Sequence, residues 1–285
     1  MARIQIIEGL SIPGTLDREN EDALGANAHT AFVLDGVTGV GDTPLMAGRS
    51  DAAWVAQAAR DLLLEHGAEG AGDLRALISR VAQGIVERFE RERLRPPAAH
   101  YEMPWTTLSL IGVADGRLNI AYLGDSRALI ETSDDEIHNV GANPSRGAFE
   151  TKLAAKMIAA HKGIGVAAQR ETVLPELRRA RDTVNRANGY WLLGADAAVG
   201  AHTNLASIEL QGPATVLLTT DGFYALTEDY RRYGDRELIA TAQTIGLKTL
   251  ARELRHIEDD DPDGARYPRM KKSDDATALL VRVEP

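Results

Sequence analysis

Apolar and polar residues follow two patterns along the chain, one typical of β-strands and one typical of helices. Short apolar runs with β-branched residues predict strands at residues 4–7, 31–34, 216–219 and 277–283. Residues 107–123 predict a β-hairpin, because Asp115-Gly116 is a strong turn signal between two such runs. We expect residues 127–131 to extend this hairpin by one strand.

Helical spacing of apolar residues occurs in several longer segments. Between residues 54 and 63 the apolar side chains lie three or four positions apart, which predicts a helix. Ser50 can cap this helix and Gly67 can end it. The same spacing predicts helices at residues 74–89 and 173–187, and one broken helix or two at 237–257, interrupted at Gly246. The first two helices are amphipathic, so each should lie on a sheet.

Helices in blocks between runs of antiparallel strands predict an α+β fold rather than a doubly wound parallel sheet. The chain has 285 residues, of which 44% are hydrophobic, and no Pro/Ser-rich linker divides it. We therefore expect a single domain over residues 1–285. Residues 132–202 are longer and more helical than a plain hairpin connection, and we expect a helical insertion there.

Charge and composition argue against several classes of protein. A formal net charge of -10 argues against binding to nucleic acid or to an anionic membrane, because those partners need a basic surface. The lack of Cys fits a reducing cytoplasm. The chain has no apolar run of membrane-spanning length and no leader at its N-terminus, so we expect a cytoplasmic protein without a membrane partner. The sequence leaves the oligomeric state open.

Five short acidic motifs are distributed along the chain. They are Arg18-Glu19-Asn20-Glu21-Asp22, Asp35-Gly36, Gly124-Asp125-Ser126-Arg127, Thr220-Asp221-Gly222 and Ser273-Asp274-Asp275-Ala276-Thr277. Most of their carboxylates lie at the end of a predicted strand, so the strands should bring them to one rim. Carboxylates that close to one another repel unless a cation compensates them.

Oxygen ligands of this kind suit a hard divalent cation. Mg²⁺ in particular binds one or two carboxylates and keeps several waters. The chain has 7 His and no Cys, and the His residues show neither H-x-H nor H-E-x-x-H spacing. A zinc site with nitrogen or sulfur ligands is therefore not supported, and we expect Mn²⁺ or Mg²⁺ as the cofactor.

In their residues and in their order along the chain, the five motifs resemble those of the protein phosphatase 2C family, the metal-dependent Ser/Thr protein phosphatases, over about residues 9–283. The resemblance implies two antiparallel β-sheets packed as a sandwich with helical layers outside. It also implies two or three bound Mn²⁺ or Mg²⁺ ions. A water activated by these ions would hydrolyse phosphoserine or phosphothreonine in a phosphoprotein substrate.

The resemblance also implies a role for the core carboxylates. Asp35 would bridge two metal ions, and the carbonyl of Gly36 would bind one of them. Asp221 and Asp274 would hold the other ion. The expected catalytic residues are therefore Asp35, Asp221 and Asp274.

Three more carboxylates complete the expected metal site. Glu21 and Asp22 would act mainly through metal-bound waters, and Asp125 would join Asp221 in a third metal site, as in bacterial members. For Asp22 and Asp125 a structural role in a turn or a helix cap stays open, because aspartates in turns often bond to their own backbone. Asp275 stands where the family most often has asparagine, and it would bind metal or face solvent.

Basic residues near the motifs are candidate ligands for the substrate phosphate. The family usually has a phosphate-binding arginine at the position of Asp17, and here Arg18 follows one place later. In a strand, a slip of one residue turns a side chain to the other face. Arg269 and Lys271, just before the last motif, are alternative phosphate ligands, although a solvated basic turn explains them equally well.

The predicted helix at 173–187 offers further cations. Arg178, Arg181 and Asn185 fall together along the margin of its buried face. Guanidinium groups suit bidentate phosphate binding, so Arg178 and Arg181 would hold the substrate phosphate. The alternative is a solvent-facing helix on which these arginines pair loosely with acidic neighbours.

Position 37 differs from that of the eukaryotic members of the family. They have a histidine there that is proposed as the general acid, and Val37 cannot donate a proton. Either a metal-bound water protonates the leaving group or the substrate has a good leaving group. Two other functions stay open: a phosphatase of a small phosphorylated metabolite, and a catalytically weak regulatory or binding module of the same fold. No core carboxylate is missing, which favours an enzyme.

Overall fold

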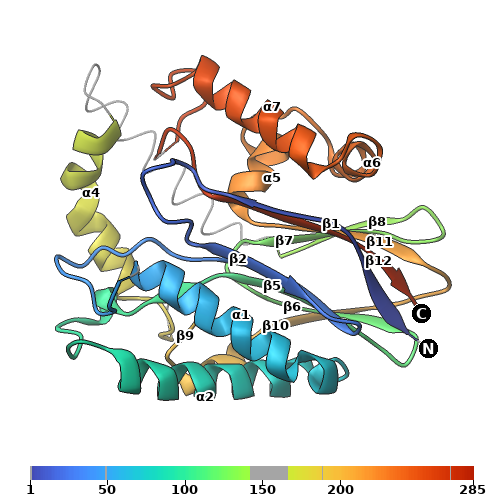
Figure 1. Ribbon diagram of the computed structural model, residues 1–285, viewed down its shortest axis with the longest axis horizontal. Coiled ribbons are helices and arrows are strands. Elements are labelled where there is room, and N and C mark those ends of the chain that lie inside the picture. Colours follow the sequence, from blue (N-terminus) through green and yellow to red (C-terminus); the bar gives the residue numbers. More distant parts are fainter. Residues whose placement is uncertain (1, 49, 142–165, 188, 270) are drawn as a thin grey trace.

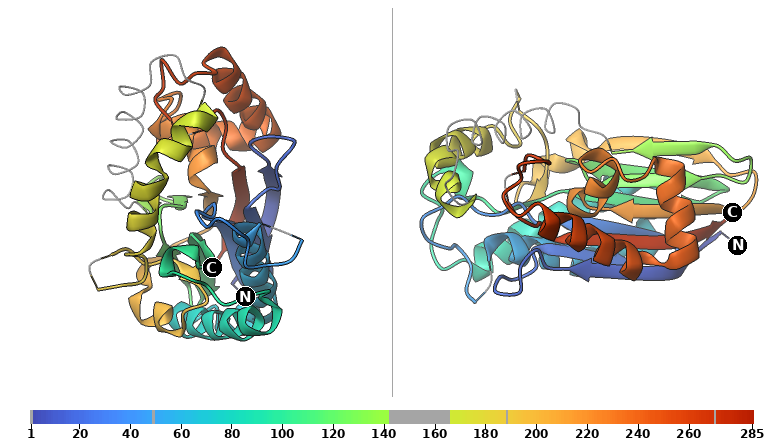
Figure 2. Two further views of the ribbon diagram at one scale, coloured as in Figure 1. Left: turned by 90° about the vertical axis from the view of Figure 1, so that its left-hand side faces the viewer. Right: turned by 90° about the horizontal axis from the view of Figure 1, so that it is seen from above.

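The computed structural model describes the chain except for residues 1, 49, 142–165, 188 and 270. Part of the predicted insertion at 132–202 therefore lies outside the described residues. Two five-stranded antiparallel sheets pack face to face, and helices cover both outer faces (Figure 1 and Figure 2). This is the α+β sandwich expected from the sequence.

Ten strands form the two large sheets. The first sheet contains β2 (Asp22–Ala26), β3 (Thr30–Asp35), β5 (Leu108–Ala114), β6 (Arg117–Leu123) and β10 (Asn204–Glu209), in the order β10-β6-β5-β3-β2. The second sheet contains β1 (Arg3–Ile12), β7 (Arg127–Glu131), β8 (Ile137–Val140), β11 (Ala214–Thr219) and β12 (Ala276–Glu284), in the order β1-β12-β11-β7-β8. Two short strands, β4 (Trp105–Thr106) and β9 (Leu193–Gly194), pair separately.

The helices form two outer layers. The first sheet is covered by α1 (Asp51–Gly70) and α2 (Leu74–Glu92), and the second by α5 (Asp221–Glu228), α6 (Asp235–Ile245) and α7 (Leu247–Asp260). Helix α4 (Val166–Arg181) stands at one end of the molecule, outside both layers (Figure 1). Two short 3-10 helices are η1 (His100–Glu102) and η2 (Ala197–His202). Within the described residues, no helix is both long and apolar enough to cross a membrane.

Strand β3 shows why the sandwich forms. Residues 31–34 are all fully buried. Because side chains alternate between the faces of a strand, Phe32 and Leu34 pack beneath α1 and α2, whereas Ala31 and Val33 pack between the two sheets. A run that is apolar at every position is therefore what a strand between two apolar layers requires.

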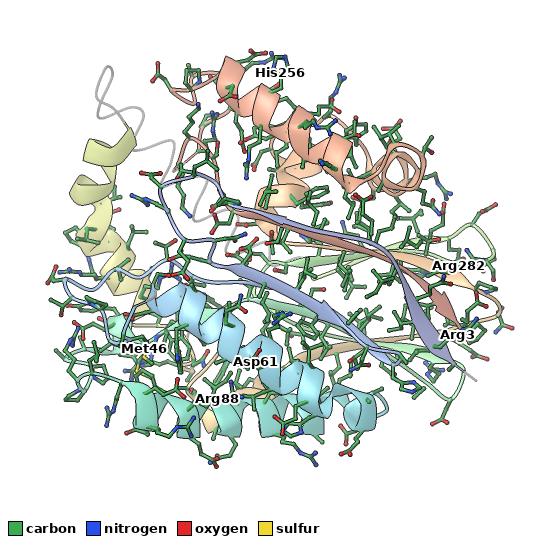
Figure 3. The ribbon with its side chains drawn as sticks, viewed as in Figure 1. Arg3, Met46, Asp61, Arg88, His256 and Arg282 are labelled. Carbon is green, nitrogen blue, oxygen red and sulfur yellow. The ribbon has the colours of Figure 1, made fainter. Side chains whose placement is uncertain are left out.

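Helix α1 begins at the predicted cap. The side chain of Ser50 accepts a hydrogen bond of 3.0 Å from a backbone N–H of the first turn. Gly67 does not end the helix, which continues to Gly70. Gly67 instead packs closely against Thr30 at the start of β3. Arg88 of α2 and Asp61 of α1 form a partly exposed ion pair of 3.4 Å (Figure 3), which contributes little to stability.

The prediction that residues 127–131 extend the hairpin is wrong. The hairpin of β5 and β6 is present, and Asp115 and Gly116 have the positive φ of 50° and 71° that its turn requires. However, β7 pairs with β11 and β8 in the second sheet. The chain crosses between the sheets at Gly124, whose φ of 83° lies in the left-handed region. This crossing contains Asp125.

The predicted helix at 173–187 ends earlier than expected. Helix α4 ends at Arg181, and Asn185 has a φ of 53° in the turns that follow. The buried amide of Asn185 exchanges two hydrogen bonds with the backbone of Leu192, at 2.8 and 3.0 Å. Bonding of an Asn side chain to backbone groups favours a turn over a further turn of helix. Asn185 therefore does not lie on one helix margin with Arg178 and Arg181.

The first turn of α5 lies close to the last acidic motif, so that a side chain at position 222 would collide with the backbone of that motif. A methyl group on Gly222 would lie 2.0 Å from the carbonyl oxygen of Asp275. We expect Gly222→Ala to lower the free energy of unfolding by about 1–3 kcal/mol, the usual cost of overpacking. Alanine normally stabilises a helix relative to glycine, so the sign of the change is diagnostic.

Urea unfolding of Gly222→Ala measures this effect. Gly39→Ala is the matched control, because a methyl group there would meet no other described part of the chain within 4 Å. Equal unfolding midpoints for the two variants would contradict the close approach of α5 to the last motif.

Candidate metal centre

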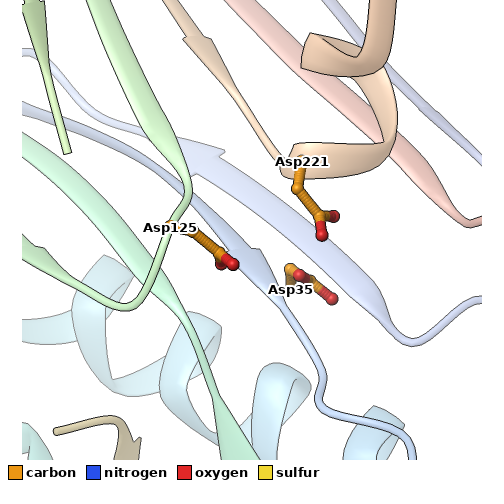
Figure 4. Close-up of side chains that lie close together, drawn as sticks. All are labelled: Asp35, Asp125 and Asp221. Carbon is orange, nitrogen blue, oxygen red and sulfur yellow. The ribbon is translucent and has the colours of Figure 1, made fainter. Parts of the chain in front are cut away.

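Three aspartates from distant parts of the chain meet at one end of the sandwich (Figure 4). Asp35 is the last residue of β3, Asp125 lies in the crossing between β6 and β7, and Asp221 is the first residue of α5. Carboxylate oxygens of all three lie within 4.8 Å of one another. Ionised carboxylates this close destabilise one another. The cluster therefore favours the binding of positive charge, and its all-oxygen donor set suits a hard divalent ion.

Sheet register fixes the position of Asp35. Its carbonyl accepts hydrogen bonds from the N–H of Thr107 at 2.8 Å and from the hydroxyl of Thr106 at 3.0 Å. The next residue, Gly36, donates its N–H to the carbonyl of Glu21 at 3.0 Å. The first two acidic motifs are thus joined through their backbones.

Asp22 lies opposite Asp35 in the pairing of β2 with β3 and is almost fully buried. The hydroxyl of Thr220 donates to Oδ2 of Asp22 at 2.9 Å, whereas Oδ1 has no hydrogen-bond partner in the described part of the chain. Burial raises the pKa of Asp22 to about 8, and the charges of Asp275 and Asp274 add to the rise. A cation, or water bound to one, would satisfy Oδ1 and restore the charged form. The residues present therefore fit a divalent metal site.

Asp274 is not one of the three clustered aspartates. Its Oδ1 accepts hydrogen bonds from Nζ of Lys271 at 2.6 Å and from the N–H of Asp275 at 2.9 Å. Burial alone would lower the pKa of Lys271. The charge of Asp274, with smaller contributions from Asp35 and Glu21, outweighs this effect and raises that pKa above its ordinary value. Lys271 therefore stays charged beside Asp274.

Two residues fasten the loops that carry these motifs. Asp275 accepts hydrogen bonds from the N–H groups of Gly14 and Glu21, both at 2.7 Å. Arg255 of α7 donates to the carbonyl of Asp274 at 2.7 Å. The carboxylate at position 275 thus ties the loop between β1 and β2 to the last motif, a role that the sequence does not indicate.

A pocket of about 420 Å³ opens beside these residues. Its lining includes the motif residues Glu21 and Asp274, the hydroxyl residue Thr38, and three cations, Arg18, Lys271 and Lys272. Arg18 is exposed, and no hydrogen bond or ion pair to its guanidinium is found among the described residues. The pocket therefore brings cations together with motif carboxylates, although none of Asp35, Asp125 and Asp221 lines it.

Arg178 and Arg181 do not line this pocket. Nε of Arg178 donates to the carbonyl of Val40 at 2.8 Å, and its guanidinium also pairs with Asp42 at 2.5 Å. Arg181 is the last residue of α4 and is partly exposed. Arg178 is thus bound to the segment that follows Asp35-Gly36, and phosphate binding by either arginine stays a prediction.

Arg269 does not line the pocket either. Its guanidinium donates to the carboxylate of Asp261 at 2.9 Å and to the carbonyls of Lys272 and Tyr267 at 2.8 and 3.0 Å. These bonds use its donors within the loop that leads from α7 to the last motif. The structure therefore gives Arg269 a role in shaping this loop.

Two hydroxyl groups belong to the site in addition to the expected ligands. Thr38 donates to Oε2 of Glu21 at 2.5 Å, and Thr220 donates to Asp22. Thr220 is part of the fourth motif, whereas the signal for Thr38 is its position three residues after Asp35.

A family model described as protein phosphatase 2C matches residues 17–256 of the chain. A comparison with curated protein sequences found no match. The chain is similar in structure to the serine/threonine phosphatase PstP/Ppp of Mycobacterium tuberculosis, with a TM-score of 0.57, 18% identity and 100% of both chains covered.

Two further solved structures share this likeness. The catalytic domain of the phosphatase PstP in complex with 2 manganese ions has a TM-score of 0.57 and 17% identity, with 100% of both chains covered. PppA, a regulatory component of T6SS in Pseudomonas aeruginosa, has a TM-score of 0.53 and 19% identity, with 99% of this chain and 97% of that chain covered. At these identities the likeness establishes a shared fold, which confirms the sandwich predicted from the sequence.

The aspartate cluster predicts that divalent ions stabilise the folded protein. An ion that binds only the folded state stabilises it by about 2.7 kcal/mol at a concentration 100 times its Kd. We therefore expect Mn²⁺ to raise the melting temperature, and the double variant Asp35→Asn, Asp221→Asn to lose most of this rise. Without metal, the double variant should be no less stable than the unaltered protein, because it lacks two mutually repelling charges.

Scanning calorimetry with and without Mn²⁺ measures both effects. Asp263→Asn is the control, since Asp263 is exposed and lies outside the acidic motifs. If the double variant kept the full rise, the stabilising ions would bind elsewhere. If it melted clearly earlier without metal, the aspartates would be structural.

Proposed function

The chain belongs to the protein phosphatase 2C family, and we propose that it is a metal-dependent phosphatase that hydrolyses phosphoserine and phosphothreonine in a protein. The main support is the convergence of Asp35, Asp125 and Asp221 within 4.8 Å, beside a pocket that presents Arg18 and Lys271. Serine/threonine phosphatases among the similar structures support this choice of substrate.

In this proposal Mn²⁺ or Mg²⁺ ions bind between the motif carboxylates. Asp35, Asp125 and Asp221 would hold them directly, together with the carbonyl of Gly36. Bound divalent ions supply a water nucleophile of lowered pKa and stabilise the charge on the phosphoryl oxygens. Thr220 donates to Oδ2 of Asp22, and Oδ1 has no hydrogen-bond partner among the described residues, so Oδ1 is available to orient a water.

We propose Arg18 as the ligand of the substrate phosphate. It lines the pocket, and none of the described residues binds its guanidinium. A free guanidinium can form two parallel hydrogen bonds to a phosphate. The side chain of Arg18 is long and exposed, so it can reach the pocket even though it stands one position away from the arginine of the family.

A different role follows for Arg178, as a positioning residue. Besides its bonds to Val40 and Asp42, its guanidinium lies 5.0 Å from the centre of the Tyr101 ring. These contacts connect α4 to the segment after Asp35-Gly36 and to η1. Arg178 would therefore act on the metal centre through the backbone rather than on the phosphate.

Position 37 supplies no acid for the leaving group. Val37 is 7% exposed and packs with Trp105, Val184 and Leu192. The departing oxygen of phosphoserine must therefore obtain its proton from water. An aryl oxygen is a better leaving group and departs without a proton, so aryl phosphates should be hydrolysed faster than phosphopeptides.

A hydrolysis panel tests the proposed function. Phosphopeptides, an aryl phosphate and small phosphorylated metabolites are compared in the presence of Mn²⁺, Mg²⁺ or a chelator. We expect phosphopeptides and the aryl phosphate to be hydrolysed only with metal, and Asp221→Asn to reduce both rates by at least about a hundredfold, since it removes a charged metal ligand. Asp263→Asn should retain the full rate. Turnover in excess chelator, or exclusive turnover of a metabolite, would overturn the proposal.

The role of Arg18 has a separate kinetic signature. Arg18→Ala should lower kcat/KM for a phosphopeptide by about tenfold, which corresponds to one charge-assisted hydrogen bond of roughly 1.4 kcal/mol. Arg18→Lys should recover part of the loss. Arg252→Ala is the control, because Arg252 is an exposed arginine on α7 that does not line the pocket. An unchanged kcat/KM in Arg18→Ala would transfer the phosphate-binding role to another cation.

A further inference from the structure

Lys271 links two acidic motifs that lie far apart in the sequence. Its Nζ lies 2.6 Å from Oδ1 of Asp274 and 3.4 Å from the hydroxyl of Thr38. That hydroxyl donates to Glu21 at 2.5 Å. One ammonium thus connects the first motif with the last at the edge of the pocket.

The loop before the last motif holds Lys271 in this place. The guanidinium of Arg269 donates to the carboxylate of Asp261 and to the carbonyl of Lys272, the next residue. Lys272 itself pairs with Asp259 of α7 at 2.6 Å, outside the acidic motifs. Of two adjacent lysines, one therefore compensates a motif carboxylate and the other a surface carboxylate.

The position of Lys271 conflicts with metal binding by Asp274. The resemblance to the protein phosphatase 2C family implies a metal ion on this aspartate, yet one of its oxygens already lies 2.6 Å from the ammonium of Lys271. A dication at the same oxygens would meet a like charge. Asp35, Asp125 and Asp221, in contrast, face one another within 4.8 Å.

We propose that Lys271 is an internal counter-cation that competes with a divalent ion for Asp274, so that metal binds more weakly on the Asp274 side of Asp35 than between Asp35, Asp125 and Asp221. The inference rests on the proposed function and on the role as a metal ligand that the family resemblance implies for Asp274. Lys271 is then a positioning residue that sets how much metal the protein needs.

Calorimetric titration with Mn²⁺ tests this competition without measuring activity. Lys271→Met keeps the length of the side chain and removes its charge. We expect the weaker Mn²⁺ ion to bind Lys271→Met more tightly than the unaltered protein by on the order of tenfold, within the usual range of coupling between two sites. Lys272→Met is the matched control and should bind Mn²⁺ as the unaltered protein does.

An Asp274→Asn background separates competition from misfolding. There Lys271→Met should no longer change Mn²⁺ binding, because the carboxylate for which metal and lysine compete is absent. Unchanged or weaker Mn²⁺ binding by Lys271→Met alone, or an equal gain in both backgrounds, would overturn the inference. Melting of the metal-free variants confirms that each one is folded.

The hydrolysis panel distinguishes failure of this inference from failure of the proposed function. Tighter Mn²⁺ binding by Lys271→Met without hydrolysis of any phosphate ester would support the counter-cation and overturn the phosphatase. Metal-dependent hydrolysis of a phosphate ester, with Mn²⁺ bound equally by Lys271→Met and by the unaltered protein, would support the phosphatase and overturn the counter-cation.

Discussion

Repulsion among carboxylates is the constraint on which the rest of this structure depends. Asp35, Asp125 and Asp221 come within 4.8 Å of one another, and Asp22 is buried next to them. In the unfolded chain these groups are separated and hydrated, so folding has to bring like charges together. Either protons or cations must compensate them. Asp22 shows the related cost of a buried carboxylate, because burial raises its pKa and the charges of Asp275 and Asp274 add to the rise. A site that is unfavourable without positive charge is, for the same reason, a strong binding site for a divalent ion.

Dense packing around the cluster makes this arrangement possible. All residues of β11 and all those of β12 up to residue 281 are buried, and β3 is buried up to its last residue. The carboxylates stand at the ends of these strands and cannot move apart without disturbing two apolar layers. Hydrogen bonds that Asp275 accepts and Arg255 donates then fasten the loops beyond the strands. The core thus fixes the positions of the carboxylates, and the loops place a cation such as Lys271 beside one of them.

The sequence predicts the parts of this fold that depend on local signals. An apolar run at every position indicates a strand buried on both faces, as in β3, and a capping serine indicates the start of α1. Strand β7 was misplaced because nothing in its own residues shows which sheet it joins. That choice is made at Gly124, where the chain turns away from the hairpin.

The candidate site, like the fold, is only partly predictable from the sequence. Asp35 and Asp221 stand at the end of a strand and the start of a helix, so the acidic motifs indicate that they meet at one rim. Asp125 lies in the crossing between two strands, and only the family resemblance indicates that it joins Asp221. The partners of Asp274 and Asp275 were not predictable. They depend on a loop whose course is set by Arg269 and Asp261, and no periodic pattern encodes such side-chain bonds.

Strand β12 follows all other strands in the sequence, yet it lies between β1 and β11 in the second sheet. Arg3 pairs with Glu284 across almost the whole length of the chain. Pairings between such distant residues form late, because a long loop must close before they are gained. The first sheet with α1 and α2 relies mostly on pairing between strands that are closer in the sequence. We therefore expect the rim of carboxylates, which Asp274 and Asp275 complete just before β12, to close late in folding.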